Sequence, residues 1–306
     1  MSETPLSLSV IVPAYNDAEN LREALARLTD QTLPPETYEI VVVDDGSTDA
    51  TSDVIAQLTA GGRHRGVRLD PNRGRAAARN AGISAAESPI IVFVDSDVFV
   101  GSDFLARHLE IHTSAGSPVV GRGPVVAIPT RDVPSRPPMT RISTAYLDTA
   151  NASIPRQTLL DAGSFDEGFR AYGWEDFDLG MRLQARHVPR VFSPAALAYH
   201  LVPPPTPESF ERYMRKEEER AGTALYLLRK HPGFSTRLLI QDTAAQRFVH
   251  FLVGGAGLIT ERNGPLIERW LRARGLHTLA FLTIRGVLNR HYFRSMDRLR
   301  ATGAVS

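Results

Sequence analysis

The chain has 306 residues, of which 42% are hydrophobic and 23% are charged, and its formal net charge is +1 at pH 7. A chain of this length and composition can bury a sizeable core, which excludes a disulfide-stabilised miniprotein and a disordered protein. Because the sequence contains no cysteine, disulfide bonds, thiolate metal sites and cysteine nucleophiles are also excluded. The near-neutral charge argues against a generally basic nucleic-acid-binding protein.

The sequence predicts no membrane-spanning helix. Its longest apolar run, residues 248–259, is interrupted by His250 and is shorter than the roughly 20 residues that span a bilayer. No basic region precedes the first apolar stretch, so we expect no signal peptide. The expected location is cytoplasmic, with the inner face of the membrane as the alternative.

Short runs rich in Val and Ile alternate with helical patterns in the first two-thirds of the chain. The predicted strands are residues 7–12, 39–43 and 90–94. The predicted helices are residues 49–58, residues 75–86, and an earlier one in which Leu21, Leu25 and Leu28 recur at helical spacing. This order predicts an α/β fold, with a Rossmann-like, mostly parallel sheet flanked by helices on both faces.

A different organisation is expected towards the C-terminus. Proline-rich stretches at residues 134–138 and 203–207 predict a loop and the end of the α/β region. Helical patterns then cover residues 208–230, 236–253 and 265–289. We therefore expect an α/β domain over residues 1–205 and a helical region over residues 206–306.

The helical region carries most of the positive charge. From Pro207 onward there are 17 Lys and Arg against 9 Asp and Glu, a net +8, which leaves −7 for the rest of the chain. Such a surface is either a packing or dimer face, which we favour, or a contact for anionic lipid or another polyanion.

Polar residues follow three predicted strands, at residues 13–16, 44–47 and 95–97. In an open α/β sheet, ligands bind beyond the carboxyl ends of the strands. The Asp95-Ser96-Asp97 loop presents two carboxylates, whose oxygens suit Mg²⁺ or Mn²⁺ beside a diphosphate. An Asx turn is the alternative explanation.

Two further segments carry candidate binding residues near the same edge. Asp45 follows a strand and could accept a hydrogen bond from a nucleobase, although a simple turn would also explain it. Asn72 and Arg79 lie around the start of an alanine-rich helix, where arginine suits base stacking or phosphate binding. A solvated helix face is the alternative for the arginine.

Acidic and aromatic residues open a later helix. Glu175 and Asp176 occupy its first turn, where the helix dipole favours anions, so helix capping could explain them. The preceding Trp174 suggests instead an acceptor platform beside a general base. His200, which follows a further apolar run ending at residue 199, suits a metal ligand beside the Asp95-Ser96-Asp97 loop.

The ordered set of motifs resembles the family 2 glycosyltransferases of the GT-A fold, over about residues 7–201. The motifs are Ser9–Asn16, Val43–Asp49, Asn72-x-Gly74, Ala78–Gly82, Asp95–Asp97 and Glu175–Asp176. The resemblance implies an inverting transfer of a sugar from a nucleotide-diphosphate sugar to an acceptor hydroxyl, assisted by Mn²⁺ or Mg²⁺.

The resemblance also implies a role for each candidate residue. On the donor side it places Pro13, Tyr15 and Asp45 at the nucleobase, Asn72 and Arg79 at the base or phosphates, and Asp95 at the ribose. On the reaction side it makes Asp97 and His200 metal ligands and Asp176 the catalytic base, with Trp174 and Glu175 binding the acceptor.

Two other functions stay open at this level. A non-catalytic partner subunit of a polysaccharide or glycolipid assembly system would not need Asp97 and Asp176. A sugar nucleotidyltransferase would need a glycine-rich loop after the first strand, where this chain has Pro13–Asn16. The expected partners are a UDP- or other nucleotide sugar, a glycan, lipid-linked or small-molecule acceptor, and either a membrane surface or a second copy through the C-terminal helices.

Overall fold

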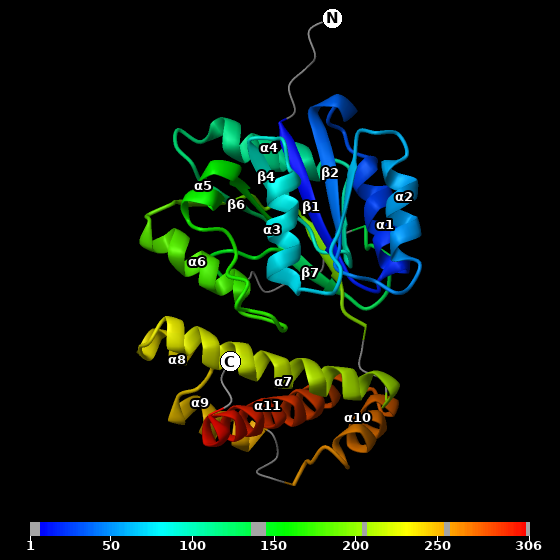
Figure 1. Cartoon of the computed structure of the whole chain (residues 1–306). Helices are drawn as coiled ribbons and strands as arrows, with labels where there is room; N and C mark the ends of the chain where they lie inside the picture. The colour runs from blue at the N-terminus through cyan, green and yellow to red at the C-terminus, as the bar shows by residue number, and fades with distance from the viewer. Residues whose placement is uncertain (1–6, 136–144, 204–206, 254–257, 304–306) are drawn as a thin grey trace, which may run out of the picture. The chain divides into compact units, whose positions relative to one another are not determined.

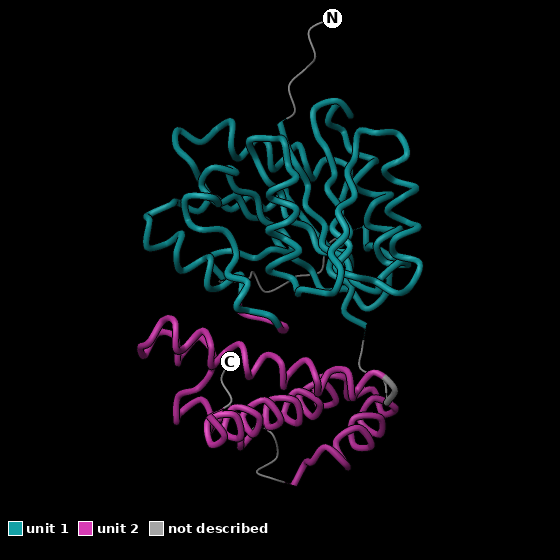
Figure 2. Tube along the Cα trace, in the orientation of Figure 1, with its two compact units in different colours: residues 1–170, 175–203 teal, residues 171–174, 204–306 magenta. Residues whose placement is uncertain are grey.

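The structure, a computed structural model, describes residues 7–135, 145–203, 207–253 and 258–303 (Figure 1). The chain divides into two compact units (Figure 2). Unit 1 comprises residues 1–170 and 175–203, and unit 2 comprises residues 171–174 and 204–306. The proline-rich stretches 134–138 and 203–207 fall partly outside the described residues.

Unit 1 is built on a mixed, mostly parallel sheet. Among the described residues its strand order is β3-β2-β1-β4-β8-β6-β9. The strands are β1 (Leu8–Ala14), β2 (Tyr38–Asp44), β3 (Arg65–Arg68), β4 (Ile90–Phe93), β6 (Val120–Arg122), β8 (Ala152–Pro155) and β9 (Arg190–Phe192). Within this sheet only β8 runs antiparallel to its neighbours, β4 and β6. The predicted α/β class is confirmed.

Helices cover both faces of this sheet, because its strand residues alternate between two cores. In β1, Val10 and Val12 face α1, α2 and α4, whereas Ile11 faces α3, α5 and α6. The first set of helices is α1 (Ala18–Thr29), α2 (Thr51–Thr59) and α4 (Phe104–Ser114). The second set is α3 (Arg75–Ala85), α5 (Arg156–Asp161) and α6 (Glu175–Ala185). A 3-10 turn, η1 (Pro35–Thr37), precedes β2.

A smaller sheet lies beyond β4, with strand order β5-β10-β7. Its strands are β5 (Val98–Val100), β7 (Val125–Ile128) and β10 (Ala198–Leu201). In its register, His200 of β10 lies opposite Val98 of β5. This pairing brings two segments that are distant in sequence beside each other, at the loop that carries Asp97.

A buried polar chain joins α4 to β8. Asn151 donates to the carbonyl of Ala196 at 2.7 Å through Nδ2, so its Oδ1 must accept from His108 Nε2, 2.9 Å away. The unprotonated Nδ1 of His108 then accepts from Ser153 Oγ at 2.8 Å, and Ser153 Oγ accepts from His112 Nε2 at 2.8 Å. In this arrangement His108 is neutral, because its Nδ1 accepts a hydrogen bond, while His112 contributes only the N–H donor at Nε2.

Unit 2 is helical. Its helices are α7 (Pro207–Lys230), α8 (Phe234–Leu239), α9 (Ala244–Val253), α10 (Gly264–Ala273) and α11 (His277–Thr302). The two longest, α7 and α11, pack against each other, and α11 also contacts α9 and α10. Among the described residues, no helix has both the length and the apolar character required to cross a membrane.

For two of the helices predicted in this region, the predicted bounds are wrong, because each is divided into two helices in the structure. The predicted helix 236–253 is broken near Gln241, which adopts a left-handed φ of 62°. The predicted helix 265–289 is broken at Gly275, whose φ of 75° ends α10, and the following helix continues to Thr302. Apolar periodicity continued across both breaks and so did not reveal them.

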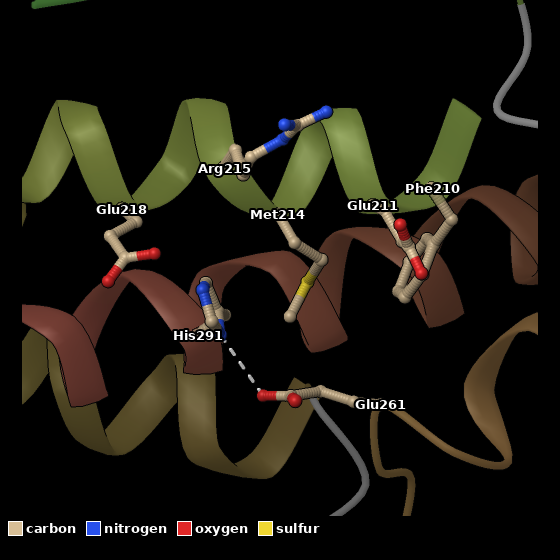
Figure 3. Close-up of a pocket in the computed structure, with 7 residues that line it drawn as sticks. All are labelled: Phe210, Glu211, Met214, Arg215, Glu218, Glu261 and His291. Atoms are coloured by element: carbon tan, nitrogen blue, oxygen red, sulfur yellow. Dashed lines mark hydrogen bonds and ion pairs between the residues drawn. The ribbon is translucent and has the colours of Figure 1, made fainter. Parts of the chain in front are cut away.

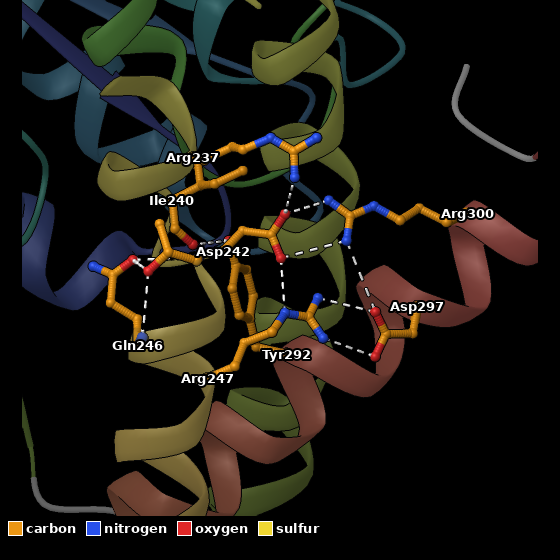
Figure 4. A network of polar contacts seen from close by, with 9 residues as sticks. Arg237, Ile240, Asp242, Gln246, Arg247, Tyr292, Asp297 and Arg300 are labelled. Atoms are coloured by element: carbon orange, nitrogen blue, oxygen red, sulfur yellow. Dashed lines mark hydrogen bonds and ion pairs between the residues drawn. The ribbon is translucent and has the colours of Figure 1, made fainter. Parts of the chain in front are cut away.

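The residue after the first break forms the polar centre of unit 2 (Figure 4). Asp242, whose side chain is buried, accepts hydrogen bonds from Arg300 and from Arg247, the latter at 2.8 Å. Burial alone would raise the pKa of Asp242, but these two guanidinium groups outweigh it and lower that pKa. Nearby, Tyr292 donates to the carbonyl of Ile240 at 2.9 Å, so the α8–α9 turn is held against α11.

Candidate active site

The ends of β1 and β2 meet at one edge of the large sheet. Both strands run further than predicted, so Pro13 and Asp44 are strand residues rather than loop residues. Tyr15 is the residue that follows β1, and its side chain is about half exposed, at 51%. An exposed ring beside the end of a parallel strand is suitably placed for stacking on a planar ligand.

Asp45 holds a neighbouring loop in place. Its carboxylate oxygens accept hydrogen bonds from the backbone N–H groups of Arg73 at 2.8 Å and Gly74 at 2.9 Å. Gly46, with a φ of 78°, permits the approach, because a Cβ there would lie 2.8 Å from the backbone nitrogen of Asn72. The exposed Asn72 therefore lies beside Asp45, although 27 residues separate them.

The Asp95-Ser96-Asp97 loop contacts β10. His200 Nε2 lies 3.3 Å from Asp97 Oδ2, and the backbone N–H of Leu201 donates to the Asp97 carbonyl at 2.9 Å. About a third of each side chain is exposed, 34% for Asp97 and 36% for His200. The structure thus brings together the two residues predicted to bind a metal.

Arg79 joins two of the other predicted residues. Its guanidinium donates to Glu175 Oε1 at 2.7 Å and to Asp95 Oδ1 at 2.9 Å. The arginine side chain is only 1% exposed, and its guanidinium also lies over the ring of Phe165. Burial would raise the pKa of Asp95, but the charge of Arg79 outweighs it and lowers that pKa. Arg79 is therefore enclosed between carboxylates and does not lie on an open surface.

Asp176 stands next to this ion pair, in the first turn of α6. Loss of hydration raises the pKa of Asp176 well above its usual value, and the negative charges of Glu175 and Asp148 raise it further. Asp148 also acts on His200, whose pKa it helps to raise. Asp176 and His200 thus share one electrostatic neighbour, which links α6 to the Asp97 loop.

Two carboxylates that the sequence analysis did not select belong to this region. Asp17, three residues after the end of β1, accepts from Ser96 Oγ at 2.7 Å, and burial raises its pKa. Asp17 is the residue after the polar segment 13–16. The rule that ligands bind beyond the carboxyl ends of strands would therefore have selected it if that segment had been extended by one residue. Asp148 follows no strand and belongs to no motif, so no sequence signal marked it.

The two residues predicted to bind the acceptor fall in different units. Glu175 is in unit 1, where it is 5% exposed and paired with Arg79. Trp174 is in unit 2, where its indole N–H donates to the carbonyl of Arg220 at 3.0 Å. Each side chain thus already makes a specific polar contact within its own unit.

The donor atoms near Asp97 suit a small divalent cation. No cluster of three or more His, Asp or Glu side chains able to hold a metal occurs in the described part of the chain. Asp97 and His200 nevertheless offer one carboxylate oxygen and one imidazole nitrogen, a donor pair that Mn²⁺ accepts. Such ions commonly complete their coordination with water and substrate phosphate.

The pocket shown in Figure 3 lies elsewhere, within unit 2. It lies between α7 and α11, and His291 contacts Glu261 there at 3.1 Å. Its lining is Phe210, Glu211, Met214, Arg215, Glu218, Glu261 and His291. None of the residues selected from the sequence lines it.

Residues 9–165 match the model of glycosyl transferase family 2, which is just over half of the chain, and the protein therefore belongs to that family. A validoxylamine A glucosyltransferase of Streptomyces hygroscopicus subsp. limoneus is 30% identical over 230 residues. That match covers 63% of this chain and 51% of the relative, so the chain spans about half the length of this curated relative.

Solved structures confirm the predicted GT-A fold. A mannosyltransferase from Pyrobaculum calidifontis, in complex with GDP-Man and Mn²⁺, matches with a TM-score of 0.60 at 18% identity, covering 92% of this chain and 86% of that one. Staphylococcus aureus TarS 1-349 in complex with UDP-GlcNAc matches with a TM-score of 0.57 at 20% identity, covering 97% of this chain and 92% of that one.

Proposed function

We propose that this chain transfers a sugar from a nucleoside-diphosphate sugar to an acceptor hydroxyl, with inversion at the anomeric carbon. The observation that carries the proposal is the pair of hydrogen bonds from Arg79 to Asp95 and Glu175. Through them the start of α6, which carries Asp176, is tied to the loop that carries Asp97. Binding of nucleotide sugars by the two similar structures supports this donor class.

The donor would bind along the strand ends. The ring of Tyr15 offers a stacking face for the base, beside Pro13. The lone pairs of Asp45 that remain after its two backbone contacts can accept from the base edge. The exposed amide of Asn72 lies within the same group, and Asp95, held by Arg79, would accept from the ribose.

Arg79 itself would be a positioning residue. Its guanidinium group is almost fully buried and already binds two carboxylates. We therefore propose this role in place of direct contact with the base or a phosphate. A planar guanidinium can hold two carboxylates in a fixed relative geometry, which an ammonium group cannot.

A divalent cation, Mn²⁺ or Mg²⁺, would bind Asp97 and His200 and neutralise charge that develops on the leaving diphosphate. Mn²⁺ in one of the similar structures supports a divalent cation here, and at 18% identity the residues that would hold it must be argued from this chain. The argument for the cation therefore depends on the contact between Asp97 and His200 and on the exposure of both side chains.

Asp176 would act as the general base. In its ionised form it would take the proton of the acceptor hydroxyl as that oxygen attacks the anomeric carbon. The bond from this carbon to the diphosphate oxygen breaks on the opposite side, and its electron pair leaves with the diphosphate. A raised pKa makes the carboxylate a stronger base, which suits this role.

The function is tested by incubating the full chain with a panel of UDP-, GDP- and dTDP-sugars, with Mn²⁺, with Mg²⁺ or with EDTA. Release of nucleoside diphosphate from at least one donor, lost in EDTA, is the expected result. Binding of a donor without release or transfer, across all donors, would instead favour a non-catalytic subunit. Chromatography of the product from an α-linked donor distinguishes inversion from retention.

A further inference from the structure

The exposed apolar side chains of the described residues are concentrated in unit 2. Among the described residues, 17 large apolar side chains are exposed, and 13 of them lie between Phe234 and Leu282. Single exposed apolar residues are common on protein surfaces, but a concentration of this kind marks an interaction site.

The helix α9 turns its polar side inward and its apolar side outward. Arg247 binds Asp242 and Asp297 of unit 2, and His250 contacts Asn289 of α11 at 3.0 Å. On the opposite side, Phe248 is 61% exposed and Phe251 is 51% exposed. A surface helix of a soluble domain normally has the reverse arrangement.

The two neighbouring helices repeat this inversion. In α10, Glu268 is buried while Leu266 and Trp270, one turn apart, are 68% and 54% exposed. At the start of α11, Thr283 is buried while Phe281 is 64% exposed. Both α9 and α10 pack against α11, so the three helices that carry these exposed side chains are neighbours in unit 2 (Figure 1).

The charge around these faces is strongly positive. Residues 244–288 contain six arginines and two glutamates, with no lysine or aspartate. Arg247, Arg272 and Arg285 are in ion pairs, whereas the exposed Arg262, Arg269 and Arg274 are in none of those the structure describes. The Arg274 guanidinium lies 3.8 Å from the centroid of the Trp270 ring, so a cation and an amphipathic aromatic ring stand together beside the apolar side chains. Arginine beside tryptophan and phenylalanine is the composition of helices that lie in a membrane interface.

We propose that α9, α10 and the first turns of α11 form a docking surface for an anionic lipid bilayer. The apolar side chains would enter the boundary between headgroups and acyl chains, and the arginines would attract anionic headgroups. Positive charge on both sides would oppose pairing of this face with a second copy of the chain, which is why the bilayer is the occupant. The proposal is independent of the catalytic assignment.

The test is co-flotation of the full chain with vesicles of phosphatidylcholine, alone or mixed with phosphatidylglycerol. We expect binding that requires the anionic lipid and weakens with added salt. Phe248→Ser/Phe251→Ser and Arg269→Glu/Arg274→Glu should each lower the partition coefficient by about tenfold or more. The matched controls in unit 1, Leu160→Ser and Arg22→Glu, should bind as the unchanged protein does.

A spectroscopic measurement locates the contact. Brominated lipid should quench the tryptophan emission of the bound protein, and Trp270→Phe should remove that quenching while binding persists. Circular dichroism of each variant separates loss of binding from loss of folding. Absence of binding at every lipid composition, or equal binding of the Phe248→Ser/Phe251→Ser variant, would overturn the proposal. So would a stable dimer that this variant dissociates, because that result assigns the face to a second copy.

Discussion

Arg79 donates a hydrogen bond to Glu175 at 2.7 Å, although 96 residues separate them along the chain. The same guanidinium binds Asp95, so the carboxyl end of β4 and the first turn of α6 are joined by one buried side chain. The proposed donor and acceptor sides of the reaction meet at this contact. The first prediction tests its strength.

Arg79→Met should destabilise unit 1 strongly. Removal of the guanidinium leaves two carboxylates unpaired in a buried position, which costs about 3–5 kcal/mol. Arg79→Lys keeps the charge but not the fork, so we expect a smaller loss. Chemical denaturation measures both. The control is Arg73→Met, which breaks an exposed pair with Glu167 and should cost at most about 1 kcal/mol. Equal losses for the Arg79 and Arg73 variants would contradict the account.

Asp97→Asn and His200→Asn should each weaken Mn²⁺ binding. We expect the apparent affinity, measured by electron paramagnetic resonance in the presence of nucleoside diphosphate, to fall by about tenfold or more. The fold should stay intact, because both side chains are partly exposed. Asp103→Asn, at an exposed carboxylate paired with Arg107, serves as the control. Unchanged Mn²⁺ affinity in both site variants would refute the metal assignment.

The acid limb of the pH–rate profile should report Asp176. Its pKa is raised in the fold, and only the ionised form can accept a proton, so the rate should fall on acidification at a pH above 3.8. Asp148→Asn removes one of the charges that raise this pKa, so the limb should move to lower pH. Asp161→Asn, on α5, should leave it in place. If the acid limb stays at the same pH in the Asp148→Asn variant, a group other than Asp176 is titrating.

The buried histidines should make the fold sensitive to mild acid. Burial lowers the pKa values of His108 and His112 to about 4, whereas an unfolded histidine titrates near 6.5. The unfolded state therefore binds more protons between these values, so stability should fall as the pH drops from 6.5 towards 4. The expected loss is about 2 kcal/mol per histidine between pH 7 and 5.

Urea denaturation at several pH values measures this loss. His112→Gln retains a donor for Ser153 but cannot titrate, so it should reduce the pH dependence. His187→Asn, at an exposed position with a left-handed φ of 57°, should not. A pH dependence that both variants share with the unchanged protein would show that other groups are responsible.

Local patterns predicted the strands β1, β2 and β4 and the helices between them, but not the shorter strands β3 and β5 to β9. The predicted strand 39–43 contains four consecutive apolar residues, 40–43, that are buried on both faces, and this composition distinguishes it without tertiary information. The ends were less predictable, because Pro13 and Asp44 extend the strands through sheet pairing rather than through their own propensity.

The features that sequence could not supply depend on long-range contacts. Arg79 lies in a helix-forming run, and nothing in that run distinguishes an arginine enclosed by Asp95 and Glu175 from a solvated one. The inversion of α9 was hidden for the same reason, because a helical pattern shows an apolar side without showing which way it faces. Asp148 belongs to no motif, and only its neighbours mark it.

The most direct test of the central claim compares Asp176→Asn with Asp161→Asn in two measurements on the same protein samples. One is the rate of sugar transfer, and the other is the calorimetric Kd of the donor that the screen identifies. The account predicts that Asp176→Asn slows transfer by about 10²- to 10⁴-fold with little change in donor Kd, while Asp161→Asn alters neither. A donor affinity that falls as far as the rate, or transfer that survives the substitution, would contradict it.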